Sequence, residues 1–254
     1  MRRGIYALLG ILVVGYVGIC AALFFFQRSL IYFPQPRSVT APESTMRLPV
    51  EGAELVVSIR PHAGSKAIVY FGGNGEDVSV NLQAFDQWFP EHALYLLHYR
   101  GYGGSTGAPT EHTNHDDAAA LFRKVQAEHS DVTVIGRSLG SGVAVRLASA
   151  YPASRLVLVT PYDSIEEIAA DAYPFVPVKW LLRDTYRSGK YAPGIRIPTT
   201  ILAAESDEVI PRASTDKLFA RFGKGVASMT VIAGAGHNTI GTKPEYRSAL
   251  QAAL

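Results

Sequence analysis

The sequence predicts an α/β fold, with a mostly parallel sheet, helices on both faces and a small helical cap, preceded by one N-terminal transmembrane helix. Three observations lead to this prediction: apolar runs of strand length alternate with helical stretches, one segment interrupts that alternation, and the N-terminal residues are almost all apolar. The 254 residues therefore divide into a membrane anchor at 1–26, a linker at 27–52 and an α/β domain at 53–254.

The N-terminal anchor is predicted from residues 5–26, which carry no charge. A helix of this length crosses roughly 30 Å of hydrocarbon. A cleaved signal peptide is the alternative, but the apolar run is too long for one and no small-x-small cleavage site follows it. Arg2 and Arg3 favour a cytoplasmic N-terminus and hence a domain on the outer (periplasmic or extracytoplasmic) side, whereas Arg28 and Arg37 favour the opposite orientation.

The α/β domain is predicted from hydrophobic periodicity. Apolar runs of strand length lie at 55–59, 67–71, 94–97, 132–135, 156–159, 200–203 and 229–232. Helical spacing of apolar residues occurs at 118–127, 139–150 and 214–222, with Asn114 and Pro211 as start signals. Residues 27–50, rich in Pro and Ser and without periodicity, suit a linker.

The segment 162–197 breaks the alternation, because it is too long for one crossover helix and contains several prolines. We expect it to form a small helical cap over the sheet edge. Its apolar side chains either wall a pocket, pack on the domain or face the bilayer. They are Tyr173, Phe175, Val176, Trp180, Leu181 and Leu182.

Composition excludes several classes of protein. The net charge is only +2 and the basic residues are scattered, so no nucleic-acid partner is expected. The one cysteine, Cys20, lies in the apolar N-terminal run, which excludes an intrachain disulfide and a cysteine-based metal site. We expect neither a cofactor nor a metal, and the oligomeric state stays open.

A candidate nucleophile lies in the motif Gly136-Arg137-Ser138-Leu139-Gly140, which joins a predicted strand directly to a predicted helix. This context is typical of a nucleophile elbow, in which a tight turn exposes the serine hydroxyl and leaves no room for side chains at the two glycines. The helix N-terminus places a positive dipole end where negative charge develops.

A serine nucleophile needs a general base and a carboxylate that orients it. In strand–turn–helix hydrolytic sites the chain order is Ser, then Asp or Glu, then His. Of seven histidines, only His237 follows Ser138, and Asp207 lies between them after a predicted strand. Asp163 is the alternative acid, although it also suits a role in lining the site or capping a helix that begins at Ser164.

An oxyanion needs backbone N–H donors. We expect one from Leu139, directly after the serine, and one from Asn74 in the loop Gly72-Gly73-Asn74-Gly75. A phosphate-binding loop is excluded because no Gly-Lys-Ser/Thr follows.

Several segments together resemble the membrane-anchored Bem46/ABHD13-like branch of the α/β-hydrolases. They are 27–34 (QRSLIYFP), 70–75 (YFGGNG), 99–105 (YRGYGGS), the elbow, 207–211 (DEVIP) and 236–237. The resemblance implies the α/β-hydrolase fold and a serine hydrolase with Ser138, Asp207 and His237 as its triad, one N-terminal anchor and no cofactor. Two positions depart from the pattern: Gly72 replaces a histidine, and His98 replaces an acidic or amide residue.

These observations predict hydrolysis of a carboxylic ester or thioester through an acyl-serine intermediate, with a small-molecule acyl ester or a lipid as substrate. Alternatives on the same fold are a serine peptidase and a lipid or lysophospholipid hydrolase. From another class, a catalytically silent membrane-anchored binding protein is the alternative. A cap of this length favours a shallow pocket for short or medium acyl chains, whereas a bilayer-facing groove would select long ones.

Overall fold

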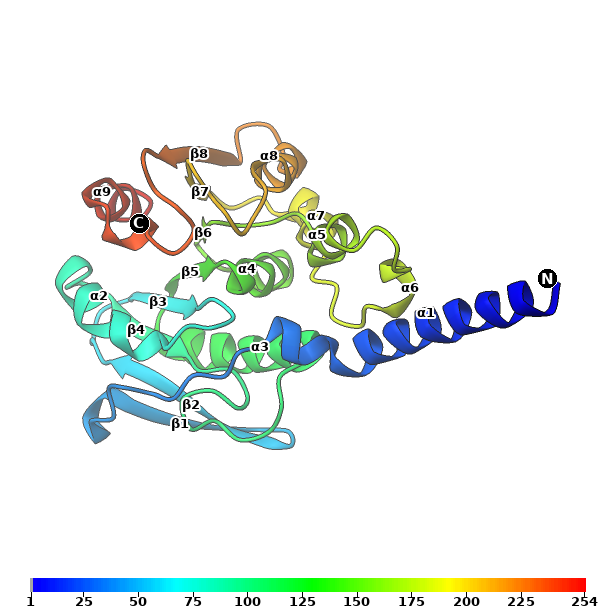
Figure 1. Ribbon diagram of the computed structural model, residues 1–254. Coiled ribbons are helices and arrows are strands. Elements are labelled where there is room, and N and C mark those ends of the chain that lie inside the picture. The colour runs from blue at the N-terminus through cyan, green and yellow to red at the C-terminus, as the bar shows by residue number, and fades with distance from the viewer. Residues whose placement is uncertain (1) are drawn as a thin grey trace.

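The computed structural model of the protein describes residues 2–254. An eight-stranded sheet forms its centre (Figure 1). The strand order is β1-β2-β4-β3-β5-β6-β7-β8, parallel from β4 to β8, with β1 and β2 antiparallel at one edge. The strands are β1 (Thr45–Val50), β2 (Ala53–Arg60), β3 (Lys66–Phe71), β4 (Ala93–Leu97), β5 (Asp131–Arg137), β6 (Arg155–Val159), β7 (Thr199–Ala204) and β8 (Ala227–Ile232).

Helices cover both faces of the sheet. The helices of the described chain are α1 (Arg2–Ile31), α2 (Leu82–Trp88), α3 (Glu111–Glu128), α4 (Leu139–Ala150), α5 (Ile165–Ala172), α6 (Val178–Leu181), α7 (Ser188–Tyr191), α8 (Arg212–Arg221) and α9 (Pro244–Ala252), of which α1 projects from the domain. Along β3, Val69 belongs to the same hydrophobic core as buried residues of α3, α4 and α8, whereas Ile68 and Tyr70 belong to the core that includes residues of α2 and α9. Successive strand residues point to opposite faces, so β3 contributes to two separate cores.

The predicted α/β fold is confirmed, and each of the seven predicted strands is present. The structure differs in the predicted linker, because β1 lies inside 27–52 and pairs with β2. Met46, Leu48 and Val50 of β1 alternate with Arg47 and Pro49, but this short edge strand contains a proline and follows a stretch rich in Pro and Ser, so the sequence predicts a linker there. The short helices α2 and α9 also went unpredicted. Helix α3 begins before Asn114, since the side chain of Thr110 accepts a hydrogen bond from the N–H of Thr113 and caps it.

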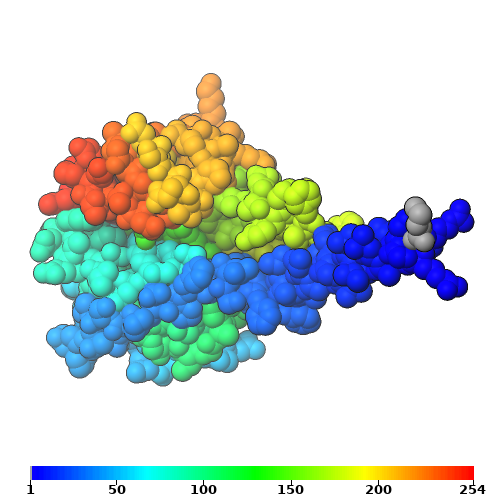
Figure 2. Space-filling model, viewed as in Figure 1, coloured from blue at the N-terminus to red at the C-terminus, as the bar shows by residue number. Residues whose placement is uncertain are grey.

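Helix α1 is long and apolar enough to cross a membrane, a property that a signal sequence shares. It continues past the predicted limit at 26 and projects from the domain (Figures 1 and 2). Its end is attached to the cap: the Gln27 amide donates to the Leu181 carbonyl at 3.1 Å and accepts from the Arg183 N–H at 2.6 Å. Farther along α1, the Tyr16 hydroxyl donates to the Phe175 carbonyl at 2.9 Å.

The segment 162–197 folds into α5, α6 and α7. Two large apolar side chains on its outer surface beside α1 are almost fully exposed: Phe175 is 86% exposed and Trp180 is 88% exposed. The sequence predicts that the apolar cap residues wall a pocket, pack on the domain or face the bilayer. Phe175 and Trp180 do not pack on the domain and point outward.

Candidate active site

Ser138 lies between β5 and α4 in a conformation that few non-glycine residues adopt, with φ 49° and ψ −118°. The turn leaves no room for side chains on either side of it. A Cβ at Gly136 would lie 2.4 Å from the Gly140 carbonyl oxygen, and one at Gly140 would lie 2.1 Å from the Phe71 carbonyl oxygen. The glycines of the motif thus permit the strain that exposes the hydroxyl to its partners.

The structure brings together Ser138, His237 and Asp207 from three separate loops. The Nε2 atom of His237 lies 2.9 Å from the Ser138 Oγ, and its Nδ1 lies 2.9 and 3.0 Å from the two Asp207 carboxylate oxygens. His237 and Ser138 are both buried. Such an arrangement allows the imidazole to accept the serine proton while the carboxylate holds its Nδ1–H tautomer.

Hydrogen bonds keep Asp207 ionised. Burial by itself would raise the pKa of this carboxyl, but His237 and the N–H groups of Ile210 and Val209 outweigh burial and hold the pKa below its ordinary value. The two N–H donors lie 2.7 and 2.9 Å from one carboxylate oxygen. Asp207 is therefore an anion at neutral pH and can stabilise a positive imidazolium.

Asp163, the alternative acid, lies elsewhere. Its carboxylate accepts a hydrogen bond from Arg221 at 2.8 Å and lies 3.8 Å from the Lys217 ammonium, both on α8. It does not cap α5, because the side chain of Ser164 itself accepts from the Glu167 N–H. Asp163 instead joins the segment after β6 to α8.

The loop after β3 faces the elbow. An ideal Cβ at Gly73 would lie 3.7 Å from the Ser138 Cβ. The Asn74 carbonyl accepts from the Phe33 N–H and the Tyr102 hydroxyl, and its side-chain amide donates to the Ile31 carbonyl. Within residues 2–254, the N–H groups of Asn74 and Leu139 have no hydrogen-bond acceptor, so both are free to bind an oxygen.

Two residues that the sequence analysis did not single out support this loop. The Glu76 carboxylate accepts from the Gly73 N–H at 2.7 Å and from the Arg137 guanidinium at 2.9 Å. Burial would raise the pKa of Glu76, but Arg137 and the Gly73 N–H hold it below its ordinary value. Arg137 also donates to the His237 carbonyl at 3.3 Å. In the sequence, the signal for this supporting role is the charge of Arg137, which ends the otherwise buried strand β5 directly before Ser138.

At the two positions that depart from the family pattern, Gly72 and His98, the structure shows which neighbours accommodate the change. A Cβ at Gly72 would lie 2.4 Å from a methyl group of Val78, so no histidine fits there, and Glu76 supports the loop instead. His98 is buried, and its Nε2 lies 2.9 Å from the Ser58 hydroxyl. Burial lowers the pKa of His98 to about 4, so it is neutral at physiological pH.

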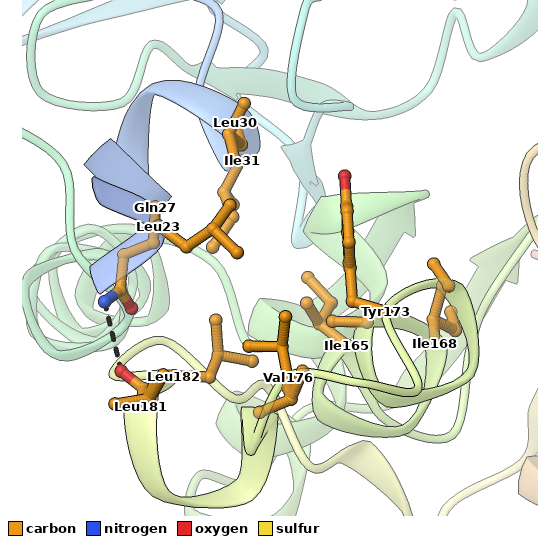
Figure 3. A pocket seen from close by; sticks show the side chains of 13 residues that line it. Leu23, Gln27, Leu30, Ile31, Ile165, Ile168, Tyr173, Val176, Leu181 and Leu182 are labelled. Atoms are coloured by element: carbon orange, nitrogen blue, oxygen red, sulfur yellow. Dashed lines mark hydrogen bonds between the residues drawn. The ribbon is translucent and has the colours of Figure 1, made fainter. Parts of the chain in front are cut away.

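An apolar pocket of about 230 Å³ opens between α1 and the cap (Figure 3). We call it the α1–cap groove. In Figure 3, α1 forms one wall and the cap the other, and Gln27 bonds to Leu181 at one edge. Its apolar lining comes from Leu23, Leu30, Ile31, Ile165, Ile168, Ala169, Ala172, Tyr173, Val176, Val178, Leu181 and Leu182. Ile31 connects the groove to the loop after β3, because its carbonyl accepts the amide of Asn74.

Comparison with known proteins identifies chains that are similar to this one. Residues 66–190 match the family described as the alpha/beta hydrolase fold. An uncharacterised protein of Mycobacterium tuberculosis is 32% identical over 230 residues, which cover 84% of this chain and 80% of that protein. The lysophosphatidylserine lipase ABHD12 of Macaca fascicularis is 32% identical over 183 residues, covering 62% of this chain and 46% of the lipase.

Two solved structures share the fold at low sequence identity. An esterase of Pyrococcus furiosus superposes with a TM-score of 0.68 at 18% identity, covering 87% of this chain and 97% of the esterase. A membrane phospholipase A described as a bacterial virulence factor gives a TM-score of 0.66 at 15% identity, covering 99% of this chain and 97% of the phospholipase.

Proposed function

Because this chain belongs to the α/β-hydrolase superfamily, we propose that it is a serine hydrolase that cleaves a carboxylic ester or thioester through an acyl-serine intermediate. The observation that carries the proposal is the chain of hydrogen bonds from the Ser138 hydroxyl through His237 to Asp207. Esterase and lipase relatives are consistent with an enzyme of this class.

The reaction proceeds in two halves. The Ser138 Oγ attacks the acyl carbon while its proton passes to the His237 Nε2, and the N–H groups of Leu139 and Asn74 bind the developing oxyanion. His237 then gives this proton to the departing oxygen or sulfur, which leaves the acyl group on Ser138. In the second half, water loses a proton to His237, attacks the acyl carbon and releases the acid, and the proton returns to the Ser138 Oγ.

Fluorophosphonate labelling tests the nucleophile. Ser138→Ala should abolish labelling and lower turnover by about four orders of magnitude or more, with the thermal unfolding midpoint retained. Ser149→Ala, a serine of α4 whose hydroxyl bonds to the Arg146 carbonyl, is the matched control and should label normally. Hydrolysis that survives undiminished in Ser138→Ala would refute Ser138 as the nucleophile and with it the acyl-serine mechanism.

In this proposal helix α1 is a retained anchor, which its length and apolar composition support and which the resemblance of residues 27–34 to membrane-anchored Bem46/ABHD13-like hydrolases implies. Arg2 and Arg3 keep the N-terminus in the cytoplasm and the hydrolase domain on the outer side. A reporter that is active only outside the cytoplasm, fused to Leu254, should give a signal. Silence of a stably produced fusion would place the domain in the cytoplasm.

A lipid or lysophospholipid is a second candidate substrate, and the α1–cap groove is the observation that favours it. One wall of this groove belongs to α1, the helix proposed as the anchor, and its lining is almost entirely apolar, which suits an acyl chain. The exposed Phe175 and Trp180 beside α1 suit immersion of the cap in lipid. Dependence of hydrolysis on acyl length distinguishes a lipid from a small ester.

A further inference from the structure

A second, polar pocket lies where Arg28, near the end of α1, meets helices α3 and α4 and the cap segment 183–191. Its volume is about 360 Å³. We call it the basic pocket, because five arginine and lysine side chains line it. They are Arg28, Arg146, Arg183, Arg187 and Lys190. Ser138, His237 and Asp207 do not line this pocket, so it is distinct from the candidate active site.

Two carboxylates line the same pocket, but each is bound to the protein itself. Glu111 accepts from the N–H groups of Thr185 and Tyr186 at 2.6 and 3.0 Å. Asp184 accepts from Arg28 at 3.0 Å and from the Tyr32 hydroxyl at 3.2 Å. These carboxylates therefore stabilise the wall of the pocket and have little capacity left for the remaining cations.

The basic side chains outnumber their carboxylate partners. Arg28 pairs with Asp184, and Arg187 pairs with Glu166. In the part of the chain that the structure describes, Arg146, Arg183 and Lys190 have no carboxylate within ion-pair distance. Like charges gathered around one cavity repel each other unless an anion binds between them.

A buried imidazole in this pocket has a carboxylate within ion-pair distance but, in the described chain, no hydrogen-bond partner. His115 is 8% exposed and lines the cavity. Neither of its ring nitrogens has a hydrogen-bond partner within residues 2–254, and its nearest carboxylate oxygen, on Glu111, is 3.6 Å away. Buried polar groups in native proteins almost always have partners, so this imidazole indicates a ligand.

The position of the pocket along α1 identifies the layer of the membrane that it would contact. Arg28 follows the charge-free run 5–26 by two residues, about 3 Å along the helix. The Arg183 guanidinium lies 4.2 Å from the centre of the Phe24 ring. Because the polar layer of a bilayer begins where the apolar run ends and is roughly 5–8 Å thick, the pocket opens at the level of the lipid phosphates.

We propose that the basic pocket binds the phosphate of an anionic membrane lipid, one headgroup per chain, apart from the acyl site. Guanidinium groups match phosphate oxygens in geometry and charge, and a neutral His115 ring can donate to one of them. The placement at the headgroup layer depends on the proposed anchoring by α1, whereas the phosphate chemistry depends only on the pocket.

Native mass spectrometry of the full chain in neutral detergent tests this site without needing a bilayer or a turnover assay. The probes are phosphatidylglycerol, phosphatidylcholine and inorganic phosphate. We expect one phosphatidylglycerol per chain, with a Kd at least about tenfold lower than that of phosphatidylcholine. The double variant Arg183→Gln/Lys190→Gln should raise the phosphatidylglycerol Kd at least about tenfold.

The matched control Lys66→Gln/Lys224→Gln removes two exposed charges outside the pocket and should leave this Kd within about twofold. Because Arg183 also contacts α1, the exposed single variant Lys190→Glu gives a second measurement and should weaken binding as well. Equal affinity of pocket and control variants would overturn the proposal. Displacement of the lipid by inorganic phosphate at similar concentration would assign the pocket to soluble phosphate and overturn the lipid assignment.

Discussion

The guanidinium of Arg137 lies 2.9 Å from the carboxylate of Glu76, and both side chains are largely buried, with 19% and 11% exposed. Through this pair the residue before Ser138 is connected to the loop after β3, and Arg137 also reaches the carbonyl of His237. A single ion pair thus fixes the three segments that must stay in register for Ser138 to be activated.

Glu76→Gln should lower kcat about 10- to 100-fold with a smaller change in KM, because it loosens the position of the oxyanion loop without removing a reacting group. Breaking a largely buried ion pair should also lower the free energy of unfolding by about 3 kcal/mol. The exposed pair Arg212 and Asp216 is the control, and Arg212→Gln should cost less than about 1 kcal/mol. An equal kcat in Glu76→Gln and the parent protein would contradict this positioning role.

Asp207→Asn should lower turnover by up to about ten-thousandfold, since the amide no longer holds the His237 tautomer. Asp163→Asn should stay within about tenfold, because its partner is Arg221 rather than His237. Comparing kcat/KM for the two variants on one ester checks the ranking. A larger loss in Asp163→Asn would show that the acid is misassigned.

The free energy of unfolding should fall as the pH is lowered from about 6.5 to 4, because His98 is buried. Burial lowers the pKa of His98 to about 4, whereas an unfolded histidine titrates near 6.5. Between these values the unfolded chain binds a proton that the folded chain does not, so protonation favours unfolding. Thermal unfolding against pH measures this slope. His98→Asn should flatten it, whereas replacement of the exposed His112 should not.

Acyl length should control the rate through the α1–cap groove. Each buried methylene contributes about 0.8 kcal/mol, so kcat/KM should rise about fourfold per methylene until the groove is filled and then flatten. Ile168→Trp places bulk in the groove and should move the plateau to shorter chains. Trp180→Ala, on the exposed outer side of the cap, should leave it in place.

These rates are measured on soluble monomeric esters, below their critical micelle concentration, so that partition into detergent does not imitate selectivity. An identical length profile in Ile168→Trp and the parent would place the acyl chain elsewhere. A rate that is independent of chain length from the shortest ester onward would favour a small ester as the substrate.

Most of the sheet was predictable because its central strands are buried on both faces. Such strands need unbroken apolar runs, and 67–71, 94–97 and 156–159 show them directly. The edge strand β1 alternates Met46, Leu48 and Val50 with Arg47 and Pro49, but it has only six residues, contains a proline and follows a stretch rich in Pro and Ser, so its sequence resembles a linker. The roles of Ser138, Asp207 and His237 followed from motif context and chain order and stay predictions, although the structure places these side chains within hydrogen-bonding distance.

By itself, the sequence determined the alternating α/β architecture, the apolar helix and the candidate serine, because periodicity and tight-turn glycines act between neighbouring residues. Only the tertiary structure decided the Glu76–Arg137 pair, the attachment of Gln27 to the cap, and the basic pocket. The paired groups are separated by 61 and 154 residues along the chain. A charge or amide looks the same in sequence whether it is solvated or buried, and packing between distant segments is what selects its partner.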